Sequence, residues 1–208
     1  MDLMDRRRMM TNKTRIPYDS EVEYLESSGG AVIDTGLMNS DIDGYYIEFS
    51  SAYSKSKFLF GNYLNNNSAI TGLRFTTRND GTMYSNVRSL TTTSLSSTGY
   101  VANGWNQAWG RVSGNMMYFK LNSEEEVSIE FVEGNATTRT VVLFGQSLNG
   151  TKGVSKISRA QFMKNGILVR DFIPVRVGTV GYMYDNVTKQ LFGNAYTSGS
   201  FVLGNDIN

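Results

Sequence analysis

The feature that most constrains this chain is a succession of short apolar or alternating runs separated by turn residues. The clearest case is the pair of runs at 157–163 and 167–173, which enclose Lys164-Asn-Gly166. Asn-Gly supplies the positive φ angles of a type I′ turn, so this stretch predicts a β-hairpin. Pro174 falls at the end of the second run, where a strand can spare an N–H. Two further strand-like runs follow at 180–185 and 190–194.

The same pattern of short runs separated by turn residues continues from residue 16 to residue 208. Ser113-Gly-Asn115 and Arg78-Asn-Asp-Gly81 each join two such runs and predict further hairpins. Residues 127–131 alternate strictly, and the apolar run 140–144 suits a central strand covered on both faces. With no amphipathic helical pattern in this stretch, the sequence predicts one all-β domain, a two-sheet antiparallel sandwich.

The residue types that are missing exclude many functions. The chain has Cys 0 and His 0, so disulfides, thiol nucleophiles, Ser-His-Asp triads and His- or Cys-ligated zinc are excluded. The formal net charge is +1, which argues against nucleic acid as a partner. We see neither a secretory signal nor an apolar run of membrane-spanning length, and so expect no membrane insertion.

Residues 1–15 differ in composition from the remainder and predict an arm that docks on a partner. Acidic residues precede basic ones, an order that suits a short helix, and the apolar residues would give this helix an apolar face. The residues expected to make the docking contacts are Leu3, Met4, Arg6, Arg7, Arg8, Met9 and Met10. A disordered tail is the alternative.

Two separated stretches resemble concanavalin A-like (laminin G-like) jelly-roll domains of the kind found in gut bacteriophages and Bacteroides proteins. The first is Glu23-Tyr-Leu-Glu-Ser-Ser-Gly-Gly-Ala-Val-Ile-Asp-Thr-Gly36. The second runs from Ile157 to Gly204 and includes Arg170-Asp-Phe-Ile-Pro-Val175 and Gly181-Tyr-Met-Tyr-Asp185. The resemblance implies a jelly-roll sandwich that binds glycans or serves as an adhesion or decoration part of a virion.

The fold also includes glycoside hydrolases, which the resemblance makes a further alternative. The laminarinase type carries Glu-x-Asp-x-x-Glu on one inward-facing strand. Glu21, Glu23 and Glu26 have that spacing, but Glu23 stands where Asp is expected. A second acidic stretch, 124–130, reads as a solvated strand face beside a turn. We therefore expect no enzymatic activity.

Oxygen ligands for calcium gather at Asp34, Asn39, Asp41 and Asp43. Their spacing does not fit an EF-hand loop, and such residues are ordinary turn formers. Bound Ca²⁺ is a possibility, and no other cofactor is expected.

Aromatic residues with polar neighbours are the candidates for a sugar site. Pyranose faces stack on Trp or Tyr, and amides hydrogen-bond the hydroxyl groups. Tyr63, Trp105, Asn103 and Asn106 are the predicted ligand contacts, on a loop rim. Trp109 is expected in the core.

These observations favour a non-enzymatic module of a bacteriophage particle, attached to capsid or tail proteins through residues 1–15. Such a module would belong to an oligomer or a large assembly and be located on the virion. The alternative is a lectin-like receptor module for host surface glycans, and a glycoside hydrolase comes third.

Overall fold

A computed structural model describes residues 16–52, 58–64, 67–75, 82–90 and 92–207. Within them, strands dominate and the helical content is a single 3-10 turn, η1 (Asn39–Asp41). The first strands are β1 (Ser20–Val22), β2 (Leu25–Ser28), β3 (Ile33–Asp34), β4 (Gly44–Ser50), β5 (Phe58–Gly61), β6 (Ile70–Phe75), β7 (Met83–Ser89), β8 (Leu95–Ser97) and β9 (Trp105–Ser113). The remaining strands are β10 (Met116–Leu121), β11 (Val127–Glu130), β12 (Val142–Leu143), β13 (Val154–Lys164), β14 (Ile167–Val177), β15 (Val180–Asp185), β16 (Gln190–Phe192), β17 (Phe201–Leu203) and β18 (Asp206–Ile207).

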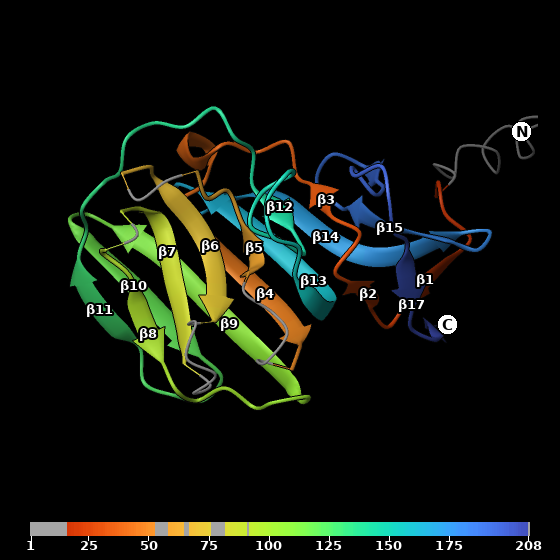
Figure 1. Ribbon diagram of the computed structural model, residues 1–208, viewed down its shortest axis with the longest axis horizontal. Coiled ribbons are helices and arrows are strands. Elements are labelled where there is room, and N and C mark those ends of the chain that lie inside the picture. Colours follow the sequence, from red (N-terminus) through yellow and green to blue (C-terminus); the bar gives the residue numbers. More distant parts are fainter. Residues whose placement is uncertain (1–15, 53–57, 65–66, 76–81, 91, 208) are drawn as a thin grey trace, which may run out of the picture.

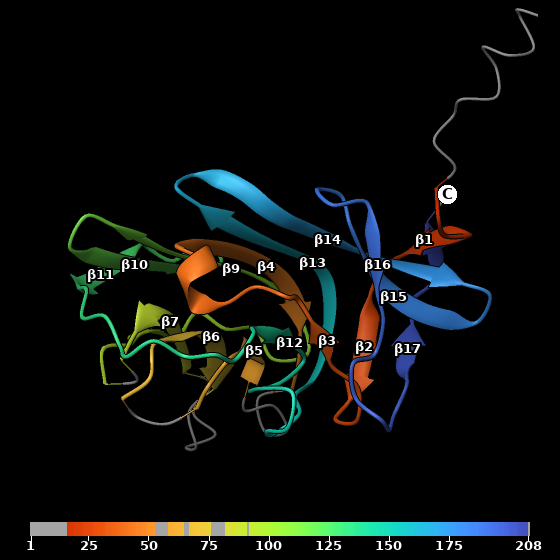
Figure 2. The same cartoon turned by 90° about the horizontal axis from the view of Figure 1, so that it is seen from above.

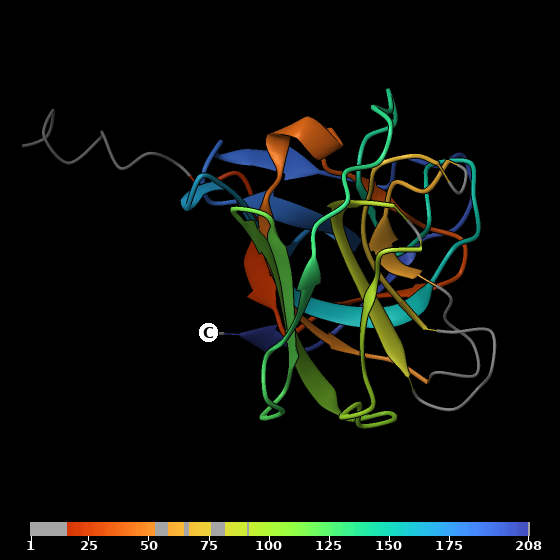
Figure 3. The ribbon, with the colours of Figure 1, turned by 90° about the vertical axis from the view of Figure 1, so that its left-hand side faces the viewer.

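The described strands form two antiparallel sheets that pack face to face (Figures 1 and 2). The 12-stranded sheet runs β11-β10-β9-β4-β13-β14-β1-β18, with β2 and β15–β17 joined beside this path. The 6-stranded sheet runs β3-β12-β5-β6-β7-β8. Figure 3 shows the two layers from the end that carries β10 and β11. The predicted two-sheet antiparallel sandwich is confirmed.

Alternation along the strands fills the space between the sheets. Tyr45, Phe49 and Phe162 point inward from the larger sheet, and Phe60 points inward from the smaller one. Ring centroids of Tyr45 and Phe60 lie 4.7 Å apart, and those of Phe60 and Phe162 lie 5.6 Å apart. Edge-to-face aromatic pairs of this kind add to the stabilisation that burial provides.

The predicted hairpin at Lys164-Asn-Gly166 joins β13 to β14. Asn165 has φ 52° and Gly166 has φ 71°, the two positive angles that a type I′ turn requires. Ser113-Gly-Asn115 likewise joins β9 to β10. The run 140–144 gives a shorter strand than expected, β12, but Val141–Phe144 are fully buried and β12 lies inside its sheet, between β3 and β5.

Candidate functional site

β9 presents a row of large side chains on the outer face of the 12-stranded sheet. Its burial alternates along the strand: Asn106, Ala108 and Gly110 are buried, while Trp105 and Trp109 face outward. The prediction that Trp109 belongs to the core is therefore wrong. Since the two tryptophans are four positions apart, the period of two places both on one face.

Trp105 forms one wall of an open groove of about 800 Å³. Its side chain is 51% exposed at the first position of β9. The ring centroid lies 6.1 Å from that of Tyr24, tilted by 52°. We call this cavity the first groove, and its lining includes Tyr24, Trp105, Glu48, Gln107, Ser158 and Ile207.

The Glu48 carboxylate lies in the first groove and is held by neighbouring donors. Gln107 donates its side-chain N–H to Oε1 at 3.0 Å, and Ser158 donates its hydroxyl to Oε2 at 3.2 Å. The Tyr46 hydroxyl donates to Oε1 as well. Burial, followed by this bond to Glu48, raises the pKa of Tyr46. Tyr46 thus stays protonated as a donor, and Glu48 keeps a fixed orientation toward the groove.

A basic side chain flanks the same groove. Lys156 places Nζ 4.4 Å from the ring centroid of Tyr24 and 3.7 Å from a Glu26 carboxylate oxygen. A cation over the ring face fixes the orientation of Tyr24 through the ring quadrupole. The Tyr24 ring beside Trp105 is thereby held in place.

Next to this groove, Asp171 of β14 anchors Arg159 of β13. Asp171 is 7% exposed and accepts bonds from Arg159 Nε at 3.1 Å and Nη2 at 3.2 Å, from Gln161 at 3.0 Å and from Asn186 at 3.3 Å. Burial pushes the pKa of Asp171 up, but the donors and the positive charge outweigh it, so the pKa lies below its ordinary value. Arg159, cross-strand from Glu48, is therefore held by a carboxylate that stays ionised at neutral pH.

A second groove, of about 550 Å³, continues along the same strand. Trp109, Arg111 and Lys120 are among the residues that line it. The Trp109 ring packs on Tyr46, with centroids 5.0 Å apart. Arg111 stacks over Tyr118 at 3.8 Å and pairs with Glu126 at 2.8 Å. Both grooves thus open on the outer face of the larger sheet.

Of the predicted ligand contacts, Trp105 alone keeps an exposed side chain at a groove within the described residues. Asn106 is 1% exposed, and its amide is fully used: Oδ1 accepts from Val101 and Asn122, and Nδ2 donates to Val101 and Gly104 carbonyls. It closes the loop that precedes β9. Asn103 lies in that loop with φ 57° and donates its backbone N–H to Ser51.

Tyr63 lies apart from Trp105 because it follows β5 of the smaller sheet. Its ring is 6.1 Å from that of Phe58, and its carbonyl accepts a bond from Arg139. It does not line the first groove. The predicted rim that joins Tyr63 and Trp105 is therefore not formed, since Tyr63 follows a strand of the 6-stranded sheet and Trp105 begins a strand of the 12-stranded sheet.

The remaining candidates have structural partners. Glu21 lies in β1 and Glu26 in β2, so the laminarinase-like spacing is interrupted between two strands and is not a single catalytic row. Glu21 accepts the Tyr18 hydroxyl at 3.0 Å, and burial together with this bond raises the pKa of Tyr18 to about 12. Glu23 accepts hydrogen bonds from the backbone N–H and from the side-chain amide of Asn205.

The acidic residues considered for calcium cap separate backbone groups. Asp34 accepts from Gly36, Asp41 accepts from Met38, and Asp43 accepts from Asn165. Among the described residues, no group of three or more acidic side chains is placed to share a cation. Asn39 is buried and donates to the Ala69 carbonyl.

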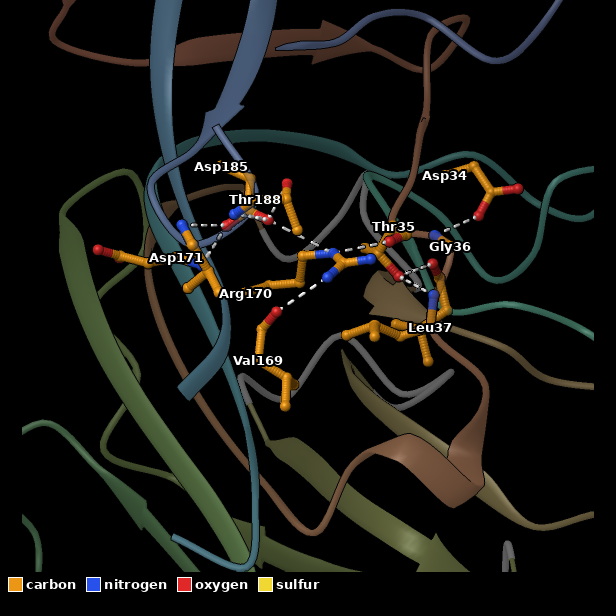
Figure 4. A network of polar contacts seen from close by, with 11 residues as sticks. Asp34, Thr35, Gly36, Leu37, Val169, Arg170, Asp171, Asp185 and Thr188 are labelled. Carbon is orange, nitrogen blue, oxygen red and sulfur yellow. Dashed lines mark hydrogen bonds and ion pairs between the residues drawn. The ribbon is translucent and has the colours of Figure 1, made fainter. Parts of the chain in front are cut away.

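Arg170, Asp171 and Asp185, from the second of the two family-like stretches, belong to a buried polar cluster (Figure 4). Asp185 is 0% exposed and accepts bonds from the backbone of Asp171, Val187 and Thr188 and from the Thr188 hydroxyl. Arg170 Nε lies 3.6 Å from Asp185 Oδ2 and donates to the Thr35 carbonyl at 3.2 Å. The cluster ties β14 and β15 to the segment after β3, so this motif supports the fold.

The predicted docking arm, with Leu3, Met4, Arg6, Arg7, Arg8, Met9 and Met10, lies outside the described residues. Over the part of the chain that is described, we find no helix with the length and apolarity to cross a bilayer.

No protein-family model matches this chain, and neither does any curated protein sequence. Among solved structures it is similar to the mouse laminin α1 chain, domains LG4-5, with TM-score 0.43, 15% identity, and 73% of this chain and 44% of that chain covered. It is also similar to the native heptameric SAP-like pentraxin from Limulus polyphemus, with TM-score 0.40, 15% identity, and coverage of 91% and 88%. A third similar structure is Scytalido-glutamic peptidase, with TM-score 0.34, 14% identity, and coverage of 91% and 100%.

This chain spans less than half of the laminin chain that it matches. The likeness concerns the fold alone, and no site residue is carried over from these proteins. Laminin G and pentraxin domains are jelly rolls of the concanavalin A-like class. The chain described here is an all-β antiparallel sandwich of two sheets.

Proposed function

We propose that the chain is a non-catalytic carbohydrate-binding or adhesion module that takes a sugar in the first groove. The observation that carries this proposal is the half-exposed Trp105 ring beside Tyr24, in the same groove as a carboxylate held by three donors. An aromatic ring offers an apolar face to a pyranose, and Glu48 offers an oriented acceptor to a hydroxyl group. Rigid strands hold both groups, which lowers the entropy cost of binding.

Glycan-array binding of the purified protein tests the proposal. Trp105→Ala removes the exposed platform, and burying an aromatic side chain contributes about 1.5–3 kcal/mol, so affinity is expected to fall at least about tenfold. Tyr196→Ala is the matched control, because Tyr196 is 37% exposed and lines neither groove. No binding by the parent protein, or equal losses in both variants, would refute the proposal.

Binding without hydrolysis is the second part of the proposal. Glu48 faces Gln107 on β9 and Arg159 on β13, so no carboxylate lies directly across from it on these two strands. The other carboxylate that lines the groove, Glu23, accepts two hydrogen bonds from Asn205. Glycoside hydrolysis uses a pair of carboxyl groups on either side of the scissile bond. Prolonged incubation with a bound glycan should therefore leave it intact by mass spectrometry, and shortened products would contradict this.

The particle-borne form of this module remains a proposal from the sequence. The distinct composition of residues 1–15 favours attachment to virion proteins through that arm. A deletion of these residues is expected to leave glycan binding intact while incorporation into particles is lost.

A further inference from the structure

The two grooves share one strand. Every outward-facing position of β9 lines one of them: Trp105 and Gln107 line the first, and Trp109, Arg111 and Ser113 line the second. The outward side chains of one strand stand in a single row. The linings of the two grooves therefore meet between Gln107 and Trp109, which are neighbours on the outer side of β9.

The tryptophans mark the length of this surface. With a rise of about 3.4 Å per residue, four residues of an antiparallel strand place Trp105 and Trp109 roughly 14 Å apart. This distance is longer than a disaccharide and matches the separation between the end rings of a tetrasaccharide. Between the two rings lie Gln107 and Glu48, which are paired across β9 and β4.

The second groove also contains groups that can bind sugar hydroxyls. Lys120 of β10 lies cross-strand from Trp109, so an ammonium donor stands beside the second ring. The Arg111 guanidinium is fixed by Tyr118 and Glu126. An aromatic face with polar groups beside it thus occurs twice along the strand.

We propose that the ligand is a linear oligosaccharide of four or more pyranose units that lies along β9 and stacks on both Trp105 and Trp109. This inference rests on the proposed function and adds the length and direction of the ligand. The first groove holds one end of the chain, and Glu48 and Gln107 contact the units between the two tryptophans.

The test is calorimetric titration with two probe ladders of increasing length, the β-1,3-linked series from laminaribiose to laminarihexaose and the β-1,4-linked series from cellobiose to cellohexaose. Affinity for one series is expected to rise up to the tetrasaccharide and then level off. Trp109→Ala should weaken tetrasaccharide binding about tenfold more than it weakens disaccharide binding. Trp109→Phe should restore most of the loss because it keeps a ring on Tyr46.

The outcomes separate this inference from the function on which it rests. An affinity that levels off at the disaccharide, or a Trp109→Ala variant that binds the tetrasaccharide like the parent, overturns the extended site. So does Trp105-dependent array binding with no binding to either ladder, because the first groove then works alone. If no glycan binds at all, the proposed function fails and the extended site fails with it.

Discussion

Asp185 offers the sharpest test of how the sandwich is held together. Its carboxylate is fully buried and accepts three backbone N–H groups and one hydroxyl, at 2.6–3.2 Å. Arg170 lies 3.6 Å away with its side chain 18% exposed. Asp185→Ala leaves these donors without their acceptor and the Arg170 guanidinium without its counter-ion. Breaking a buried pair in this way costs about 3–5 kcal/mol, against a total stability of about 5–15 kcal/mol.

For a domain of this size, each kcal/mol shifts Tm by about 2–4 °C, so Asp185→Ala is expected to lower Tm by roughly 6–20 °C. Calorimetry or circular dichroism at neutral pH measures the shift. Asp185→Asn keeps one acceptor oxygen and should fall between the parent and Asp185→Ala, which provides a readout if the alanine variant does not fold.

Asp206→Ala is the control, because Asp206 makes a shorter ion pair with Arg176, at 2.6 Å, on the exposed surface. Solvent and salt screen such pairs, so this variant should melt near the parent. The reasoning is wrong if Asp206→Ala loses as much stability as Asp185→Ala, or if Asp185→Ala changes Tm by less than about 2 °C. The first result would mean that burial does not set the contribution of an ion pair to stability. The second would mean that the buried Asp185 cluster contributes little to stability.

Three further predictions concern the Asp171–Arg159 pair, the close packing at Gly153 and the segment 1–15. Because the pKa of Asp171 is lowered in the folded protein, its ionised carboxylate contributes stability above the unfolded pKa of about 3.9, and this stability is lost as pH falls through the folded pKa. Arg159→Ala raises the folded pKa, so Tm measured from pH 7 down to pH 3 should begin to fall at a higher pH than in the parent. Identical curves for the two proteins would contradict the role of Arg159. Gly153→Ala places a Cβ 2.2 Å from the Phe58 carbonyl oxygen and should destabilise by about 1–3 kcal/mol in urea unfolding, whereas Gly44→Ala makes ordinary contacts and should match the parent; equal midpoints would contradict the clash. Deleting residues 1–15 should leave the melting curve of the sandwich unchanged, and normal incorporation of the truncated chain into particles would refute the docking arm.

The sequence by itself determined the fold class and several local turns. Asn165 and Gly166 specify their hairpin because the required positive φ angles are a property of those two residues. The same period of two is seen in β4 and β13, where Phe49 and Phe162 point into the interior. The even spacing of Trp105 and Trp109 held the signal for the shared face, but Trp105 was predicted on a loop rim, whereas β9 begins at this residue.

The tertiary structure decided which residues meet. Tyr24, Glu48 and Trp105 come from three separate parts of the chain, and their contact depends on β2, β4 and β9 taking their places around β13. The same holds for Tyr63, which local composition grouped with Trp105 and which lies in the loop after β5 of the other sheet. Turn chemistry acts between neighbours in sequence, whereas strand order depends on long-range pairing and core packing, so the groove could not be read from local patterns.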